Sequence, residues 1–413
     1  MGDPVTIIGA GVVGMACAVA LQRDGQQVHV VDGRAPGEGC SKGNAGLIAA
    51  DHVLPLATPG ILRQVPRMLF DPMGPLTLRL SYLPRIAPWL VRFLANATPA
   101  RVERLSAALV ALTRPALDDW RDLLAEIGGE PLIEQRGWLA LYRTESAFLR
   151  DAGERERQRS LGVAVEELAG EALRQQEPAL GDRKLARGVL FPDSAHSIDS
   201  FRLVQHLAEA VARHGGRVTR AEVTAIEAGP DGPRLLRTDA GPIPVRRLLV
   251  AAGAWSKPLA RALGHRVPLD TERGYHIHLA NPGVTLARPL YDAERKFFLT
   301  PMETGLRIAG TVELGGLRAG PDWRRADILL EQARTLVPGL DGGDPTRWMG
   351  FRPTLPDSLP VIGPSPAMPN AWFAFGHQHL GLTLAAVTGR MIAAMIAGRP
   401  SSIDAAPYRI DRF

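Results

Sequence analysis

Three glycines near the start of the chain, Gly9, Gly11 and Gly14, have the spacing of a dinucleotide-binding turn. In such a turn the first glycine permits the tight bend, the second lets the backbone approach a pyrophosphate, and the third lets the following helix pack closely. The N-terminus of that helix offers unpaired N–H groups and the positive end of its dipole to the phosphates. Asp32, at the end of the next apolar run, can accept hydrogen bonds from ribose hydroxyls, and its negative charge disfavours a 2′-phosphate. The pattern predicts a site for FAD or NAD and leaves that choice open.

The elements around this turn form an opening βαβ unit, and pieces of the same kind recur later in the chain. Rossmann-like segments therefore lie at the start, the middle and the end, with a second domain threaded between them. The predicted strands and helices of these segments are residues 5–8, 28–31, 248–252 and 372–375, Met15–Asp24, a helix from Asp199 or Ser200 to His214, and Thr383–Ala397.

This arrangement predicts an α/β fold with α+β elements, in which a mixed-sheet substrate domain is inserted into a Rossmann-like domain. The second domain is expected to contain one long helix, Val102–Ile127, and strands at 137–142, 275–279 and 306–310. Residues 217–249 alternate as short strands do. The predicted boundaries are 1–60, 190–265 and 345–413 for the dinucleotide domain, and 61–189 and 266–344 for the substrate domain.

Composition excludes several classes of protein. The chain has 413 residues and a net charge of +5, without a basic stripe or a nucleic-acid-binding motif, so we expect no nucleic-acid partner. The mild cationic excess suits an anionic substrate or a membrane surface. Two cysteines, Cys17 and Cys40, provide no disulfide framework and fit a reducing compartment. We find neither a signal peptide nor an apolar run of roughly 18 residues, and therefore expect a cytoplasmic protein.

Five further segments, in chain order, resemble motifs of the D-amino-acid oxidase superfamily, and of its D-amino-acid dehydrogenase branch in particular. They are Ser41-Lys42-Gly43-Asn44-Ala45-Gly46-Leu47, Val250-Ala251-Ala252-Gly253-Ala254-Trp255-Ser256, Arg273-Gly274-Tyr275-His276, Gly350-Phe351-Arg352-Pro353 with its following Pro356-Asp357, and Gly376-His377-Gln378-His379-Leu380-Gly381. The resemblance covers essentially the whole chain and implies FAD rather than NAD. Sarcosine-oxidase relatives attach FAD through a C-terminal cysteine; the last cysteine is Cys40, so the flavin is expected to be non-covalent.

The fingerprint and the resemblance together predict the cofactor contacts. The adenosine and pyrophosphate end is assigned to Gly9, Ala10, Gly11, Val12, Val13, Gly14, Asp32, Gly33, Val223, Ala252, Gly253 and Trp255. The flavin end is assigned to Ser41, Lys42, Gly43, Asn44, Ala45, Gly46, Leu47, Gly350, Arg352, Gly376, His377, Gln378, His379, Leu380, Gly381, Leu382 and Thr383.

Four residues are candidates for contact with the substrate. Arg352 can clamp a carboxylate through two parallel charge-assisted bonds, and the resemblance implies the same role. Tyr275 can supply a further bond or can be a half-buried strand tyrosine. His276 lies on the opposite face of that strand, so the two cannot easily face one small substrate. His52 lies just past the predicted flavin loop, residues 41–47, and is a candidate by resemblance alone. No strong general base is evident.

The segment before the last helix carries two histidines, His377 and His379. Backbone N–H groups of Leu380, Gly381 and Leu382 are expected to point at the flavin C2 carbonyl, where the helix dipole stabilises negative charge on reduced flavin. A metal site is the rival interpretation, but no third ligand is placed by sequence to complete it, so no metal is expected.

The predicted reaction is hydride transfer from the Cα of a D-amino acid to flavin N5, giving an imino acid that can hydrolyse to a 2-oxo acid and ammonia. Residues 376–383 resemble members that act on cis-4-hydroxy-D-proline or D-proline. The expected acceptor is a quinone or another carrier, and the apolar, Arg-rich segment 61–95 is either a peripheral membrane contact or a set of substrate-domain helices. Alternatives are a glycine- or sarcosine-type oxidase that uses O2, and a flavoprotein subunit of an opine- or hydroxyproline-oxidising complex.

Overall fold

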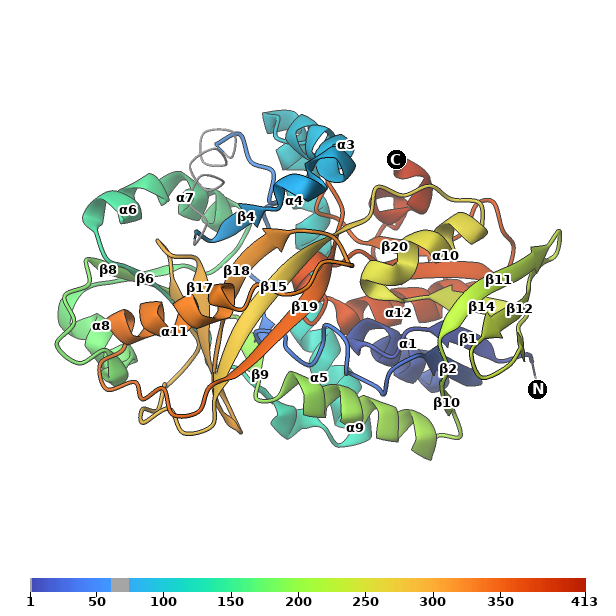
Figure 1. Cartoon of the computed structure of the whole chain (residues 1–413), viewed down its shortest axis with the longest axis horizontal. Helices are drawn as coiled ribbons and strands as arrows, with labels where there is room; N and C mark the ends of the chain where they lie inside the picture. Colours follow the sequence, from blue (N-terminus) through green and yellow to red (C-terminus); the bar gives the residue numbers. More distant parts are fainter. Residues whose placement is uncertain (1, 61–73) are drawn as a thin grey trace.

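A six-stranded sheet forms one of the two lobes of the protein, on the right of Figure 1. The computed structural model describes residues 2–60 and 74–413. Five of the six strands run parallel and the last, β20, is antiparallel to its neighbour. In spatial order the strands are β10 (Arg217–Arg220), β2 (Val28–Asp32), β1 (Val5–Ile8), β14 (Arg247–Val250), β21 (Ala371–Phe375) and β20 (Val361–Pro364).

Helices from distant parts of the chain complete the core of this lobe. α1 (Val12–Arg23) packs against α12 (Ala385–Ile396) and α9 (Ser200–Arg213), and α12 packs in turn against α5 (Ala116–Ile127). The contact between α1 and α12 is close, because a Cβ added at Gly389 would lie 2.8 Å from the carbonyl oxygen of Ala16. The first and last helices of the chain therefore share one apolar core.

A nine-stranded mixed sheet forms the other lobe, on the left of Figure 1. Its long central strands are antiparallel, whereas β16 pairs with β6 and β4 pairs with β18 in parallel. α11 (Arg324–Leu336) covers one face of it. The strands are β19 (Thr346–Thr354), β15 (Asp270–Leu279), β18 (Gly305–Leu314), β17 (Phe297–Met302), β16 (Leu290–Asp292), β6 (Trp138–Tyr142), β8 (Arg187–Phe191), β7 (Glu166–Leu168) and β4 (Leu76–Leu78).

Two small sheets and several short helices complete the chain. One sheet joins β11 (Val223–Gly229), β12 (Gly232–Thr238) and β13 (Ile243–Pro244), and the other joins β3 (Leu47–Ile48), β9 (Ala195–Ser197) and β5 (Ile133–Glu134). The remaining helices are α3 (Leu83–Ala95), α4 (Pro99–Thr113), α6 (Glu145–Arg150), α7 (Ala152–Ser160), α8 (Gly170–Gln176) and α10 (Ser256–Ala262).

The predicted α/β architecture, a Rossmann-like lobe with an inserted mixed sheet, is confirmed. The cap of α9 is the predicted one, since the Asp199 carboxylate accepts the N–H groups of Phe201 and Arg202. Within the described residues, no helix is long and apolar enough to cross a membrane.

Two segments lie elsewhere than the sequence pattern indicates. The single helix expected over Val102–Ile127 is two helices, α4 and α5, because Pro115 cannot continue the first one. Both helices pack on the core of the dinucleotide-binding lobe instead of the substrate lobe. Conversely, β19 pairs with β15 in the nine-stranded sheet, although residues 345–413 were expected in the other domain. A local pattern identifies a strand but does not identify its partner.

Candidate active site

The predicted dinucleotide turn connects β1 to α1 and has the geometry that its glycines require. Gly9 has a φ of +116°, which a residue with a side chain rarely adopts. A Cβ at Gly14 would lie 1.9 Å from the carbonyl oxygen of Gly9, so the helix can pack this closely only with glycine there. Ser41 Oγ accepts the N–H of Val12, which ties the flavin loop to the N-terminus of α1.

Asp32 supports this turn from the end of β2. Its Oδ2 accepts the N–H of Ala10 at 2.8 Å, and its Oδ1 accepts the N–H of Arg34 at 2.9 Å. Each carboxylate oxygen has a second lone pair, which suits a ribose hydroxyl. The carboxylate is therefore fixed beside the turn, where the adenosine of a dinucleotide is expected.

The other residues assigned to the adenosine end lie around the same edge of the parallel sheet. Gly33 packs against Glu222, next to Val223 at the start of β11. Ala252 and Gly253 follow β14, and Gly253 has a φ of +53°. Trp255 is 37% exposed, with the guanidinium carbon of Arg34 4.9 Å from its ring centroid.

A cavity of about 500 Å³ lies between the flavin loop, the nine-stranded sheet and α3. It brings together segments that are far apart in the sequence. The predicted residues that line it are Gly43, Asn44, Ala45, Leu47, His52, Tyr275, Gly350, Arg352, Gln378, His379, Leu380 and Thr383. The other residues assigned to the flavin end or the substrate are not part of this lining: Ser41, Lys42, Gly46, His276, Gly376, His377, Gly381 and Leu382.

Arg352 extends from β19 across the glycine of the neighbouring strand. A Cβ at Gly274 would lie 2.4 Å from the guanidinium carbon of Arg352, so the bare backbone of Gly274 gives the arginine its path. Among the described residues, no hydrogen bond or ion pair holds this guanidinium. Glu272, its cross-strand partner, is buried, and burial raises the pKa of its carboxyl despite the nearby arginine. The geometry leaves a fork of donors available to an anion in the cavity.

Tyr275 borders the cavity, but its hydroxyl is bound on the other side. It donates to Glu313 Oε2 at 2.5 Å and accepts the N–H of Asp322 at 3.1 Å. Glu313 also pairs with the fully buried Arg273. Burial, together with the Glu313 carboxylate, raises the pKa of Tyr275. These contacts favour the second of the two interpretations, a structural tyrosine.

His276 points to the opposite side of β15, as the alternation of the strand predicts. Its Nδ1 lies 3.1 Å from the carbonyl oxygen of Gly43, and its ring stacks on Trp348. The indole fills the space above Gly43, where a Cβ would lie 2.1 Å from it. Burial, with the nearby Arg307, lowers the pKa of His276 to about 3. Its contacts position the flavin loop, and it does not line the cavity.

His52 lies at the cavity edge beside Asp51, and its ring meets that of His379 edge-on with centroids 5.3 Å apart. The Nδ1 atom of His52 is 3.3 Å from Asp51 Oδ2. Burial alone lowers the pKa of His52, but the Asp51 carboxylate outweighs it and raises the pKa above its ordinary value. Burial and the neighbouring His52 and Arg352 lower the pKa of His379 to about 3.

The 376–383 segment borders the cavity, and its Gln378–Leu380 turn lies beside β19. Gln378 has a φ of +52°, and its amide donates to the carbonyl of Leu355. Thr383 Oγ1 accepts the N–H of Ala49, which joins this segment to the strand after the flavin loop. His377 is buried behind the segment, where its Nε2 contacts Thr388 and burial lowers its pKa to about 3.

Comparison with known proteins identifies the family. The family described as FAD dependent oxidoreductase (DAO) matches residues 4–395. The chain is 38% identical to a D-amino-acid oxidase of Bradyrhizobium diazoefficiens, over 100% of this chain and 99% of the relative. The chain belongs to this family of FAD-dependent oxidoreductases. A D-amino acid dehydrogenase of Paramagnetospirillum magneticum is 34% identical over 99% and 98% of the two chains.

Solved structures show the same fold for this FAD-dependent oxidoreductase. Glycine oxidase from Geobacillus kaustophilus superposes with a TM-score of 0.75 at 21% identity, covering 100% of this chain and 99% of that one. L-proline dehydrogenase from P.horikoshii superposes with a TM-score of 0.74 at 18% identity, covering 100% and 97%. The predicted cofactor, FAD, is thereby confirmed.

The residues of the oxidoreductase fit the cofactor at both ends. The glycine turn leaves backbone within reach of a pyrophosphate, and the cavity is bordered by both segments assigned to the flavin. Burial raises the pKa of Cys17 and that of Cys40, where Arg352 only partly opposes it, and a raised pKa disfavours the reactive thiolate. We therefore propose a non-covalent flavin.

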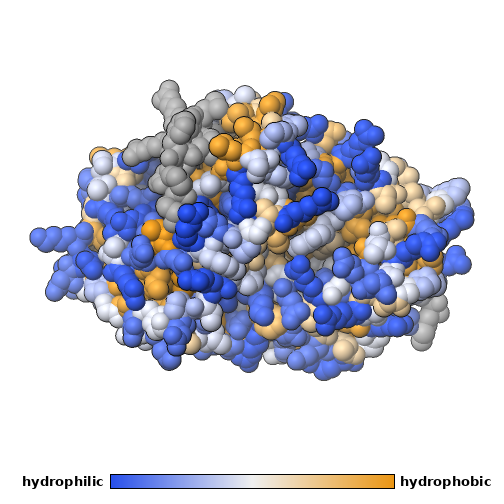
Figure 2. Space-filling model, viewed as in Figure 1, coloured by the Kyte–Doolittle hydropathy of each residue, from blue (hydrophilic) through white to orange (hydrophobic). Residues whose placement is uncertain are grey.

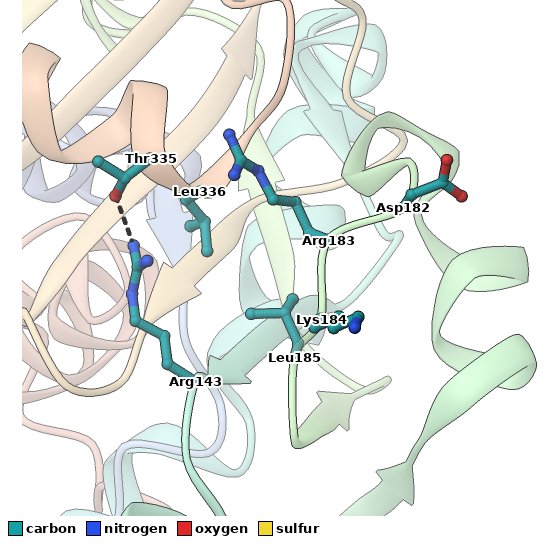
Figure 3. Close-up of a pocket in the computed structure, with 7 residues that line it drawn as sticks. All are labelled: Arg143, Asp182, Arg183, Lys184, Leu185, Thr335 and Leu336. Atoms are coloured by element: carbon teal, nitrogen blue, oxygen red, sulfur yellow. Dashed lines mark hydrogen bonds between the residues drawn. The ribbon is translucent and has the colours of Figure 1, made fainter.

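A second pocket, of about 440 Å³, lies in the substrate lobe between α11 and residues 182–185 (Figure 3). Arg143 binds Asp292 and Thr335 there, and Asp182 and Lys184 are exposed. None of the predicted site residues lines it. The pocket at Arg352 is therefore the candidate active site.

Sequence reasoning did not single out several residues of the cavity. Asp51 directly precedes His52, and an Asp-His pair after the flavin loop was a signal that could have been used. Glu272 is visible only through its register with Arg352. The apolar wall on α3 and β4, which includes Leu76, Trp89 and Phe93, has no motif that marks it.

Proposed function

We propose that the enzyme oxidises a D-amino acid at Cα, with Arg352 holding the substrate carboxylate. The observation that carries the proposal is a guanidinium without an ionic partner among the described residues, facing a cavity bordered by both flavin segments. The names of the relatives, D-amino-acid oxidase and D-amino acid dehydrogenase, support the same substrate class.

The chain's own residues orient the substrate and limit its contact with water. FAD, when bound, accepts the hydride from Cα. Arg352 fixes one end of the substrate by two parallel bonds, and this fixes the direction of the Cα–H bond. The N–H groups of Leu380, Gly381 and Leu382 remain our proposed donors to the flavin C2 carbonyl.

The wall on which the substrate side chain would rest is apolar. Leu76 and Leu78 of β4 and Trp89 and Phe93 of α3 supply it. An uncharged side chain is therefore favoured, and cis-4-hydroxy-D-proline and D-proline remain our specific candidates. A larger apolar D-amino acid fits the same chemistry.

Anaerobic reduction of the bound flavin tests this proposal directly. A panel of D- and L-isomers, including the hydroxyprolines, proline, phenylalanine, arginine and glutamate, is mixed with the oxidised enzyme. We expect D-isomers with uncharged side chains to bleach the flavin fastest. Faster reduction by L-isomers, or by D-arginine or D-glutamate, would contradict the proposed substrate class.

The electron acceptor is a separate proposal, because relatives of both names, oxidase and dehydrogenase, match the chain. We propose a quinone or another carrier. Initial rates with oxygen and with a soluble quinone, measured on one preparation, separate the two. Fast peroxide formation would instead favour the oxidase, and a purified chain that holds FAD without turnover would favour the subunit of a larger complex.

We also propose that the enzyme is cytoplasmic and that it touches the inner membrane peripherally through α3. The sequence predicted this contact for residues 61–95. Residues 61–73 of that segment lie outside the described residues. α3 carries an exposed apolar face beside exposed arginines, which Figure 2 shows as an apolar patch. Val91 of α3 is 68% exposed and Leu80, in the turn before α3, is 81% exposed, whereas Trp89 on the other face of the helix lines the cavity. One helix thus separates the cavity from the patch.

Replacing Val91 by aspartate tests the contact. The variant should keep its turnover with a soluble dye and lose turnover with a quinone embedded in anionic vesicles, because insertion of a carboxylate into the bilayer interface is unfavourable. Equal loss with both acceptors would contradict a role at the membrane. Leu149→Asp, at an exposed apolar residue outside α3, is the matched control.

A further inference from the structure

A buried carboxylate, Asp51, stands behind the cavity wall with one oxygen fully engaged. Its Oδ1 accepts the indole N–H of Trp138 at 2.8 Å and the hydroxyl of Ser194 at 2.6 Å. The side chain is 4% exposed. The two donors come from β6 of the nine-stranded sheet and from the turn before β9 of a small sheet, and together they fix the carboxylate's orientation. The substrate contacts proposed above make no use of it.

The second oxygen, Oδ2, faces Nδ1 of His52 at 3.3 Å. The contact is a close approach of opposite charges rather than an aligned hydrogen bond, and such catalytic contacts often become aligned only in the complex with substrate. A carboxylate accepts and cannot donate, so it selects the tautomer with the proton on Nδ1. The lone pair of Nε2 is then on the side of the ring away from Asp51, and the ring borders the cavity that contains Arg352.

We propose that His52, oriented by Asp51, is the base that takes a proton from the ammonium group of the bound substrate. The inference rests on the proposed function. The substrate N–H bond breaks and a bond from that proton to Nε2 forms. The neutral amine then supports loss of the Cα hydride to the flavin, and the C=N bond of the imino acid forms. His52 is thus a catalytic residue and Asp51 its positioning residue.

The charges around His52 are compatible with this role. The carboxylate of Asp51 raises the pKa of the imidazole against the effect of burial, which makes it a stronger base. Glu154 of α7 is the other carboxylate that acts on it. His379 is neutral in the working range, because its pKa is lowered to about 3. Arg352 and Lys296 are the cations that line the same cavity.

Replacing Asp51 by asparagine separates positioning from structure. The amide oxygen of asparagine can still accept hydrogen bonds from Trp138 and Ser194, so the buried contacts are retained. Its NH₂ group now faces Nδ1 of His52 and donates to it, which moves the imidazole proton to Nε2. The ring then presents a donor to the cavity instead of a lone pair, and it cannot accept the substrate proton.

The experiment measures the pH dependence of kcat for D-amino acid oxidation in the FAD-loaded enzyme. We expect kcat of the wild type to rise with pH through the pKa of His52. His52→Gln should lower kcat about a hundredfold or more and remove this limb. Asp51→Asn should lower kcat by nearly the same factor. Added imidazole should restore activity to a His52→Ala variant. His214→Gln, at an exposed histidine that follows α9, is the matched control and should behave as the wild type.

A second readout does not depend on turnover. Imidazole ¹⁵N shifts of the histidine-labelled holoenzyme should show His52 protonated on Nδ1 in the wild type and on Nε2 in Asp51→Asn. An unchanged tautomer, or an acid limb that survives His52→Gln, would overturn the inference. A wild type that oxidises no D-amino acid would overturn the proposed function instead. Should Asp51→Asn fail to fold, His52→Gln and its rescue decide the question.

Discussion

The adenosine end and the reacting end of the site are built in different ways. At the adenosine end, residues 9–14 and Asp32 belong to one βαβ unit, and their task is met by backbone conformation and backbone N–H groups. At the reacting end, Arg352, His52 and His379 come from three distant segments, and their task is met by side chains: the charge of Arg352 and the two imidazole rings. A local motif can encode the first, whereas only the whole fold assembles the second.

Gly14→Ala should give the largest effect and acts on the adenosine end. The added Cβ would meet the backbone carbonyl of Gly9 at 1.9 Å, and backbone cannot move aside as a flexible side chain can. We expect loss of bound FAD, measured by the flavin-to-protein absorbance ratio of the purified variant. Gly153→Ala, where nothing lies within 4 Å of the new Cβ, is the control. Full FAD occupancy in Gly14→Ala would break the contrast between the two ends.

Arg352→Met should affect the reacting end alone. Removing a charge that pairs with a desolvated carboxylate costs about 2–5 kcal/mol, so kcat/KM should fall roughly thirtyfold to several thousandfold while FAD stays bound. Arg352→Lys should recover only part of this, because an ammonium lacks the planar fork. Arg347→Met, an exposed arginine of the same strand, is the control. Unchanged kinetics would show that Arg352 does not bind the substrate carboxylate.

Gly274→Ala should shift Arg352 without unfolding the protein. The new Cβ would meet the end of the arginine side chain at 2.4 Å, and that end can rotate away. Displacement of a positioning group by about 1 Å can cost roughly a hundredfold in rate. We expect a rise in KM and a fall in kcat with an unchanged flavin spectrum, measured by steady-state kinetics. A loss of FAD would show that the two ends are less independent than proposed.

His377→Gln should give the smallest change, and it concerns stability. The folded pKa of about 3 lies below the unfolded value of about 6.5, so the unfolded chain takes up a proton first as the pH falls. The free energy of unfolding should therefore decrease between pH 6.5 and 3, by up to about 1.4 kcal/mol per pH unit from this group. Urea unfolding at several pH values should show a shallower slope for the variant. Equal slopes in the variant and the wild type would contradict the assignment.

The same contrast explains how much could be read from the sequence. The glycine turn, Asp32 and the cap of α9 depend on neighbours close in the chain, and the structure places them as predicted. Tyr275 was ambiguous because its partner, Glu313, lies on another strand. The place of β19 and the role of Asp51 depend on strand pairing and on Trp138 and Ser194. Such contacts between distant segments have no local signature.

The packing of α1 on α12 also has a consequence for biosynthesis. β14 lies between β1 and β21 in the sheet, and β21 and α12 come later in the chain than β1, α1, α9 and β14. Until they emerge from the ribosome, the face of α1 that packs on α12 and one edge of β14 have no partner. A nascent chain with exposed apolar surface and an open strand edge is prone to aggregation. The nucleotide turn is therefore translated well before the strand and the helix that complete the core beneath it.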